Sequence, residues 1–192
     1  NNAFAITDGT VILNGGENTL YQGIQGGAAG QVLTLGRTAT LNLNGNSQML
    51  GGLRSGNDLG VAGSGGVIQN SGANATFVNL STGTDRIWGG QITGNIFYNK
   101  GGSNTQTFYD NNSYSLGPFI NGGTVNLTDM ARLSGAGAID VNYAALTLTN
   151  TGTMFIDDRI NNASAITSRG ATFTLVGRDN INVTETLGTL DL

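Results

Sequence analysis

Residues that could carry chemistry are sparse in this sequence, and the densest charged cluster is Asp157-Asp158-Arg159. Two neighbouring carboxylates could act as an acid–base pair, or could share a calcium ion with backbone carbonyl groups in a turn. Adjacent residues of a strand point to opposite faces, so the pair could not serve one substrate from a strand. The surrounding sequence also lacks the spacing of a calcium-binding loop. We therefore expect a solvated turn with a local ion pair.

Other carboxylates could come together only from distant parts of the chain. A pair that cleaves glycosidic bonds needs its two groups about 5 to 9.5 Å apart, and the sequence leaves open that Asp110 meets Asp85 or Asp129. Asp and Glu together account for only 12 of 192 residues, and histidine, the commonest general base at neutral pH, is absent. We predict that the chain is not an enzyme, has no catalytic residue and needs no metal or cofactor.

Aromatic residues are concentrated between positions 88 and 119. Aromatic rings on a polar surface can stack on sugars or bury part of a partner, whereas rings inside a fold only fill its core. Adjacent pairs such as Phe97/Tyr98 and Phe108/Tyr109 would place one ring inside and one outside if they lie in strands. Four members of this group are candidate contacts for a ligand or partner: Trp88, Tyr98, Tyr109 and Tyr114.

Short phrases that alternate apolar and polar residues recur along the whole chain. Examples are GTVIL at 9–13, ATLNLNG at 39–45, GTVNL at 123–127 and ATFTLVG at 171–177. An alternation with period two is typical of a half-buried strand, and the Gly, Asn and Asp residues that bound each phrase are typical of turns. The side chains that we expect to point inward are Val11, Leu13, Leu33, Leu35, Leu41, Leu43, Val125, Leu127, Leu146, Leu148, Phe173, Leu175, Leu190 and Leu192.

The composition excludes several classes of protein. Glycine accounts for 32 of 192 residues and lysine for one, Lys100, and this scarcity of helix-forming surface residues argues against helices. With a net charge of −4 and 10% charged residues, the surface has no basic stripe for nucleic acid or anionic lipid. No apolar run approaches the roughly 18 residues that cross a membrane as a helix.

The first 13 residues resemble residues 111–127, because both stretches begin with two asparagines and end in Gly-Thr-Val-x-Leu. We interpret this similarity as an internal repeat of long period within one solenoid segment that spans residues 1–192. Many short strands with glycine-rich turns fit a right-handed parallel β-helix or an antiparallel β-sandwich. Tight Asn-Gly hairpins are scarce between neighbouring strands, which favours the all-β parallel β-helix, with about nine turns of roughly 22 residues each.

The stretch from Lys100 to Leu127 resembles the autotransporter-associated β-strand repeat, in which a lysine and a glycine pair precede strand phrases that end in Gly-Thr-Leu-x-Leu. The matching positions are Lys100, Gly102, Asn112, Tyr114, Gly117, Ile120, Gly123, Thr124, Val125 and Leu127. The stretch departs from the family pattern at 105–109, where the usual Thr-Leu-Thr-Leu is missing, and at Pro118-Phe119. Residues 39–79 and 146–192 are similar to other segments of such proteins.

The resemblance implies a β-helical passenger segment of a large bacterial surface or secreted protein, with an adhesive or fibrous role outside the cell. The absence of cysteine agrees with it, since a long exported solenoid does not depend on disulfides. The sequence begins and ends within strand phrases, so we expect a portion of a longer chain, or copies that stack end to end. Expected partners are the chain itself, neighbouring segments or a surface polysaccharide. The alternative function is a glycan-binding or glycan-cleaving β-helix similar to a tailspike.

Overall fold

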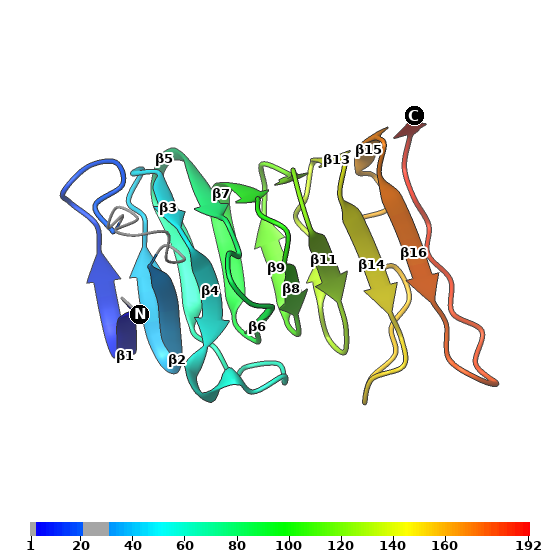
Figure 1. Cartoon of the computed structure of the whole chain (residues 1–192), viewed down its shortest axis with the longest axis horizontal. Helices are drawn as coiled ribbons and strands as arrows, with labels where there is room; N and C mark the ends of the chain where they lie inside the picture. Colours follow the sequence, from blue (N-terminus) through cyan, green and yellow to red (C-terminus); the bar gives the residue numbers. More distant parts are fainter. Residues whose placement is uncertain (1–2, 21–30) are drawn as a thin grey trace.

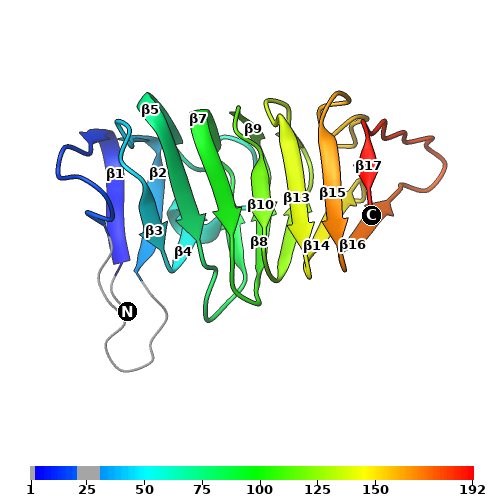
Figure 2. The ribbon, with the colours of Figure 1, turned by 90° about the horizontal axis from the view of Figure 1, so that it is seen from above.

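The computed structural model describes residues 3–20 and 31–192, which form a solenoid of parallel strands with about seven turns (Figure 1). The turns stack along one long axis, with the first strand at one end of the rod and the last at the other (Figure 2). Apart from one short 3-10 helix, η1 (Gly56–Asp58), the regular elements of these residues are strands. Their bounds are β1 (Ala3–Ile12), β2 (Val32–Asn42), β3 (Gln48–Leu50), β4 (Gly52–Ser55), β5 (Val67–Asn79), β6 (Arg86–Trp88), β7 (Gln91–Lys100), β8 (Thr105–Phe108), β9 (Asn111–Tyr114), β10 (Pro118–Ile120), β11 (Thr124–Leu127), β12 (Arg132–Leu133), β13 (Ala138–Asn142), β14 (Ala145–Thr149), β15 (Ala165–Arg169), β16 (Thr172–Val176) and β17 (Leu190–Asp191).

Two sheets form the long walls of the solenoid. The larger sheet runs in the order β1-β2-β5-β7-β10-β13-β15-β17, with β3, β4, β9 and β12 attached to it, and the smaller sheet in the order β16-β14-β11-β8-β6. Every pairing between these strands is parallel. The expected parallel solenoid is therefore confirmed, and the antiparallel sandwich does not occur.

The turns differ in length, which explains why the number of turns is lower than the nine expected. Along the smaller sheet, Thr105 pairs with Thr124, Thr124 with Ala145, and Ala145 with Thr172, so these steps span 19, 21 and 27 residues. The step from β1 to β2 is longer still, since Ala3 pairs with Val32. The longer turns include loops that leave the wall of the rod, so a uniform estimate of roughly 22 residues per turn was too short.

Apolar side chains in equivalent positions of successive turns stack inside the rod. Ten of the residues that we expected to face inward behave as predicted or nearly so: Val11 is half-buried, and Leu13, Leu33, Leu35, Leu41, Leu43, Val125, Leu127, Leu146 and Leu148 are buried. The other four lie in the last turn and are exposed: Phe173 by 36%, Leu175 by 47%, Leu190 by 46% and Leu192 by 90%. Phe173 and Leu175 do pair with the buried Leu146 and Leu148, so they continue the interior rows. They are exposed because no further described turn lies over them.

The two similar stretches near positions 9 and 123 share a backbone feature. Gly9 and Gly123 both have positive φ angles, 75° and 62°, directly before their Thr-Val pairs, a conformation that glycine adopts without steric cost. Val11 lies in β1 of the larger sheet, whereas Val125 lies in β11 of the smaller one. Residues 1–2, where the first stretch begins, lie outside the described residues.

Candidate functional site

The aromatic residues that we proposed as ligand contacts lie mainly inside the solenoid. Trp88, Tyr98 and Tyr114 are at most 1% exposed, so the expectation that they contact an external ligand is corrected. The ring centroid of Tyr98 lies 5.5 Å from that of Phe108 and 5.8 Å from that of Tyr114. These rings stack between turns because the rows of the parallel ladder bring them together. Among the four candidates, only Tyr109 is partly accessible.

The expected alternation of adjacent aromatic pairs is confirmed. Tyr98 and Phe108 are buried, whereas Phe97 and Tyr109 are half-exposed on the outer side of the same strand or just beyond its end. Phe97 lies against Phe119 of the next turn, with 5.8 Å between the ring centroids. The strand parity thus decides which ring of each pair faces the core.

The polar groups next to the aromatic cluster are paired with one another. The side-chain amide of Asn79 donates hydrogen bonds to the Tyr98 hydroxyl at 3.0 Å and to Oε1 of Gln106 at 2.8 Å. Burial raises the pKa of Tyr98, and the hydrogen bond from Asn79 opposes this only in part, so the hydroxyl stays protonated at neutral pH. This network bonds neighbouring turns inside the rod and presents no group to a ligand.

The single lysine, Lys100, is also buried, at the end of β7. Its Nζ donates hydrogen bonds to the carbonyl oxygens of Gly101 at 2.6 Å, Gly102 at 3.3 Å and Gly122 at 3.1 Å. Desolvation lowers the pKa of the amine to about 8, although the charge of Asp85 acts in the opposite direction. The amine therefore closes a glycine-rich corner by satisfying carbonyl groups of two turns.

The three carboxylates considered as members of a catalytic pair, Asp85, Asp110 and Asp129, accept hydrogen bonds from other parts of the solenoid. Asp85 accepts from the backbone N–H of Thr105 at 2.8 Å. Asp110 accepts from the backbone N–H of Gly63 at 3.2 Å, and Asp129 from the Thr153 hydroxyl at 2.7 Å. Each carboxylate thus has a hydrogen-bond partner from another part of the solenoid.

Asp157 and Asp158 have the same role near the end of the chain. Asp157 accepts a hydrogen bond from the backbone N–H of Thr184 at 2.8 Å, and Asp158 from that of Thr186 at 3.0 Å. The hydrogen bond from Thr186 is the largest factor that holds the pKa of Asp158 below its usual value. The local ion pair expected with Arg159 is not formed, because the guanidinium of Arg159 is buried in the rod. In the described residues, no cluster of acidic, cysteine or histidine side chains could hold a metal ion.

Arg159 is the largest charged side chain of the interior. Its guanidinium donates to the carbonyl oxygens of Asp129 at 3.0 Å, Ala131 at 2.8 Å and Thr149 at 2.9 Å. Glu185 lies close by and accepts from the backbone N–H of Arg159 at 2.8 Å. Desolvation lowers the pKa of Arg159 to about 10 in spite of the nearby carboxylate, and burial also raises the pKa of Glu185. The Arg159 side chain therefore links its own segment to the segment of Asp129 and Ala131 and to that of Thr149, inside the rod.

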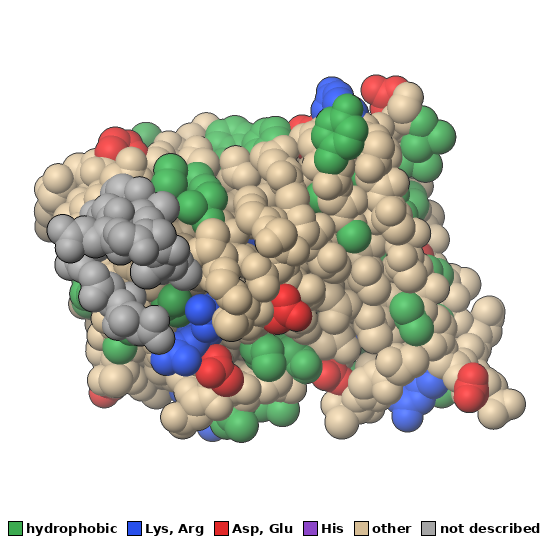
Figure 3. Space-filling model, in the orientation of Figure 1, with side chains coloured by type: hydrophobic (Ala, Val, Ile, Leu, Met, Phe, Trp, Pro, Cys, Tyr) green, Lys and Arg blue, Asp and Glu red, His purple; other side chains and the backbone are tan. Residues whose placement is uncertain are grey.

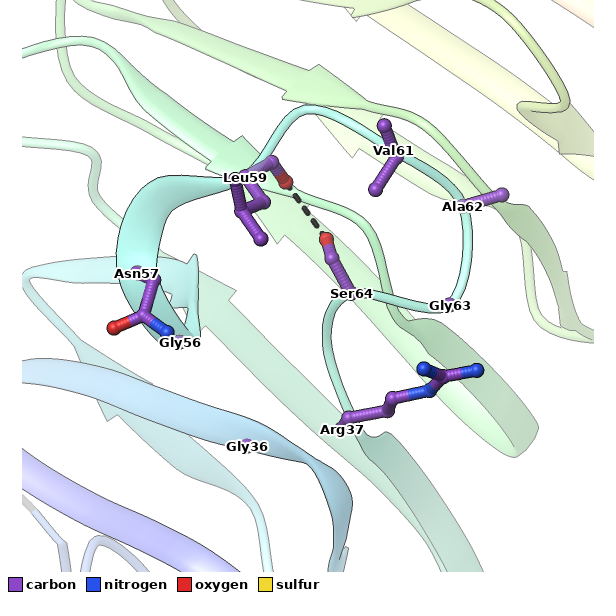
Figure 4. Close-up of a pocket in the computed structure, with 9 residues that line it drawn as sticks. All are labelled: Gly36, Arg37, Gly56, Asn57, Leu59, Val61, Ala62, Gly63 and Ser64. Carbon is purple, nitrogen blue, oxygen red and sulfur yellow. Dashed lines mark hydrogen bonds between the residues drawn. The ribbon is translucent and has the colours of Figure 1, made fainter.

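The side of the rod carries a pocket of about 340 Å³ between β2 and the loop that follows η1. We call it the flank pocket; its lining consists of Gly36, Arg37, Gly56, Asn57, Leu59, Val61, Ala62, Gly63 and Ser64. Figure 4 shows Leu59, Val61 and Ser64 turned toward the inside of the loop, with the Arg37 side chain passing beside Gly63. Leu59 and Val61 are 53% and 54% exposed.

The loop that forms the flank pocket is anchored at several points. The Ser64 hydroxyl donates to the carbonyl oxygen of Leu59 at 2.7 Å, which closes the loop on itself (Figure 4). The carboxylate of Asp110 holds the backbone N–H of Gly63, and the ring of Tyr109 packs against Gly60 so closely that an added Cβ there would lie 2.7 Å from it. Tyr109, the one accessible candidate, therefore supports this loop.

Arg37 reaches the surface through an irregularity of the parallel ladder. Ile6 pairs with Leu35 and Asp8 with Thr38, so β2 contains one more residue than β1 at this point. Such a β-bulge redirects side chains, and it places the guanidinium of Arg37 outside, where strict alternation with Leu35 and Ala39 would place it inside. Sequence reasoning missed this position; a lone arginine at an inward position of a strand phrase is the signal that could have revealed it.

Comparison with models of protein families, with curated proteins and with solved structures finds no match to this chain. The fold and its local chemistry are therefore the basis for any assignment of function. Among the described residues, no helix has the length and apolar character needed to span a membrane.

Proposed function

We propose that this chain is a structural, non-enzymatic β-solenoid segment of an extracellular bacterial protein, and that its end face associates with the first turn of a second copy. The observation that carries the proposal is the exposed apolar surface of the last turn. Phe173, Leu175 and Leu187 surround an apolar hollow of about 230 Å³ that also reaches the interior residues Leu146 and Leu148. In every other described turn these interior rows are covered by the next turn.

The direction of the strands favours head-to-tail association. In the described residues, β17 pairs only with β15, and β1 pairs only with β2. Because the ladder is parallel throughout, the free edge of β17 in one copy and that of β1 in another copy have the same strand direction. A free strand edge is a template for a further strand, and such a heterologous contact repeats without closing, which builds a fibre.

The extracellular role and the relation to autotransporter passengers are supported by three features together. The chain forms a parallel solenoid, as the resemblance implied. It contains neither cysteine nor histidine, and the carboxylates of Asp85, Asp110 and Asp129 accept hydrogen bonds from other parts of the solenoid. A long rod whose sequence contains only 10% charged residues suits an adhesive or fibrous segment. The cell surface or the surrounding medium is the proposed location.

The experiment that tests self-association is light scattering coupled to size exclusion over a wide range of protein concentration, followed by electron microscopy. We expect the apparent mass to rise with concentration and unbranched fibres to form at the highest concentrations. The change Leu175→Lys should reduce association, because it places a charge on the end face. The matched control is Tyr143→Lys, since Tyr143 is 85% exposed and lies in the loop between β13 and β14.

A monomer at all concentrations would contradict association between copies, and would favour an end face covered by a neighbouring segment of a longer chain. Equal effects of the two lysine substitutions would also contradict the proposal, because the end face would then not be the contact.

A further inference from the structure

We propose that the flank pocket binds a small ligand that carries a carboxylate next to an apolar face, of the class of uronic acid sugars. This inference goes beyond the structural role, since it concerns the side of the rod and not its ends. It is independent of whether copies of the chain associate.

The guanidinium of Arg37 supplies the charge for such a ligand. Neither of the ion pairs found among the described residues involves Arg37, so its charge is free to meet an anion. Of the two carboxylates that contact the loop, Asp58 is paired with Arg54 at 3.2 Å, and Asp110 accepts the hydrogen bond from the backbone N–H of Gly63. A planar guanidinium matches a carboxylate in geometry and can donate two parallel hydrogen bonds to it.

The walls of the flank pocket fit an apolar face with one charged end. Leu59 and Val61 offer aliphatic surface that is more than half exposed, and Gly36 and Gly56 contribute only backbone to the lining. A volume of about 340 Å³ lies at the lower end of the range for small-molecule sites. A pyranose ring has an apolar C–H face and, in a uronic acid, a carboxylate at one side.

The flank pocket is also held in shape before any ligand arrives. Asn57 and Asp58 adopt φ angles of 61° and 48°, which are uncommon for residues other than glycine. Residues in such conformations persist where the surrounding contacts hold them. Here the ion pair of Asp58 with Arg54 holds the start of the loop, and the contacts of Ser64 with Leu59 and of Asp110 with Gly63 hold its remainder. A rigid loop lowers the entropy that binding must overcome.

The test is an NMR titration of the labelled protein with D-glucuronate, with D-glucose as the neutral probe and inorganic phosphate as the simple anion. We expect saturable shifts of the backbone amides of 56–64 with glucuronate, and much weaker ones with glucose or phosphate. Arg37→Met should weaken glucuronate binding at least about tenfold, as loss of a charge-assisted hydrogen bond predicts, and Arg37→Lys should restore part of it. The control Arg169→Met removes an exposed arginine on β15 and should leave binding unchanged.

Four results would overturn the proposal. Glucose that binds as tightly as glucuronate would show that the carboxylate is not recognised. Equal binding by the Arg37→Met variant, or the absence of saturable shifts in the loop, would show that the flank pocket is not the site. If phosphate bound with the same affinity as glucuronate, the site would be only an exposed positive charge that attracts any anion.

Discussion

The side-chain amine of Lys100 donates a hydrogen bond to the carbonyl oxygen of Gly122, in the next turn of the solenoid, at 3.1 Å. A buried ammonium group thus joins the glycine-rich corners of two turns. The lysine and the glycines belong to the stretch that resembles the autotransporter-associated repeat, so the contact gives a physical reason for that combination of residues.

The buried amine should make the protein more stable at mildly alkaline pH. The pKa of Lys100 is about 8 in the folded chain and 10.5 when unperturbed. Between these pH values the unfolded state therefore binds more protons than the folded state. The free energy of unfolding then rises with pH, by up to about 1.4 kcal/mol per pH unit. Above about pH 10 the trend reverses, because burial raises the pKa of Tyr98 and Tyr114 in the folded state. Urea unfolding between pH 7 and 11 measures both effects. The variant Lys100→Met should lack the rise, and an unchanged slope in it would contradict this assignment.

Trp88 provides a direct optical check of the fold, because it is the only tryptophan and is fully buried. We expect its emission at a shorter wavelength than that of free tryptophan and little quenching by iodide. Unfolding in urea should shift the emission and expose the ring to the quencher. Truncation by Trp88→Ala should destabilise the protein by about 3 to 5 kcal/mol, as for other large buried side chains. A readily quenched Trp88 in the folded protein would mean that the ring lies on the surface after all.

Arg159 should be essential for stability although it forms no ion pair through its side chain in the described residues. The change Arg159→Leu leaves the carbonyl oxygens of Asp129, Ala131 and Thr149 without their buried donors. We expect a loss of about 2 to 4 kcal/mol in the free energy of unfolding. The exposed Arg178 serves as the control, and Arg178→Leu should cost less than about 1 kcal/mol. Similar losses in the two variants would show that the buried hydrogen bonds contribute little.

The carboxylates that join neighbouring turns should make the protein sensitive to acid. Burial alone would raise the pKa of Asp129, but hydrogen bonds from Thr153 and Met154 and the charge of Arg159 outweigh it, so the pKa lies below the usual value. A depressed pKa contributes stability that is present above the unfolded value near 3.8 and is lost as the pH falls through the folded value. Thermal unfolding from pH 6 to pH 2.5 measures this loss.

The variant Asp129→Asn separates this carboxylate from the others. It should be less stable than the original chain at pH 6, and the difference should shrink as the pH falls below the unfolded value of 3.8 and through the lower folded pKa, because the original carboxylate then becomes protonated as well. The exposed Asp191 provides the control. If Asp191→Asn changed the acid profile as much as Asp129→Asn, a general charge effect would explain the profile better.

The alternation of apolar and polar residues predicted most of the interior rows. Leu33 and Leu35 before the bulge, and Leu41 and Leu43 after it, are buried, as the alternation of a strand predicts. The same parity predicted correctly that Tyr98 and Phe97 lie on opposite sides. Local sequence is sufficient for such conclusions, since two neighbouring residues of a strand cannot share a face.

Other features depended on which turns lie next to one another, and this only the tertiary structure decided. Because the turns are of unequal length, the carboxylate of Asp110 meets the backbone N–H of Gly63, 47 residues earlier in the chain. For the same reason, the guanidinium of Arg159 meets the carbonyl oxygen of Asp129. The bulge at Arg37 and the exposed end at Leu175 likewise arise from the contacts of a residue with other turns. The side of a strand on which a residue lies is a local property, so the alternation in the sequence shows it. Its contacts in adjacent turns depend on the lengths of the loops between them, because these lengths decide which residues are stacked on one another.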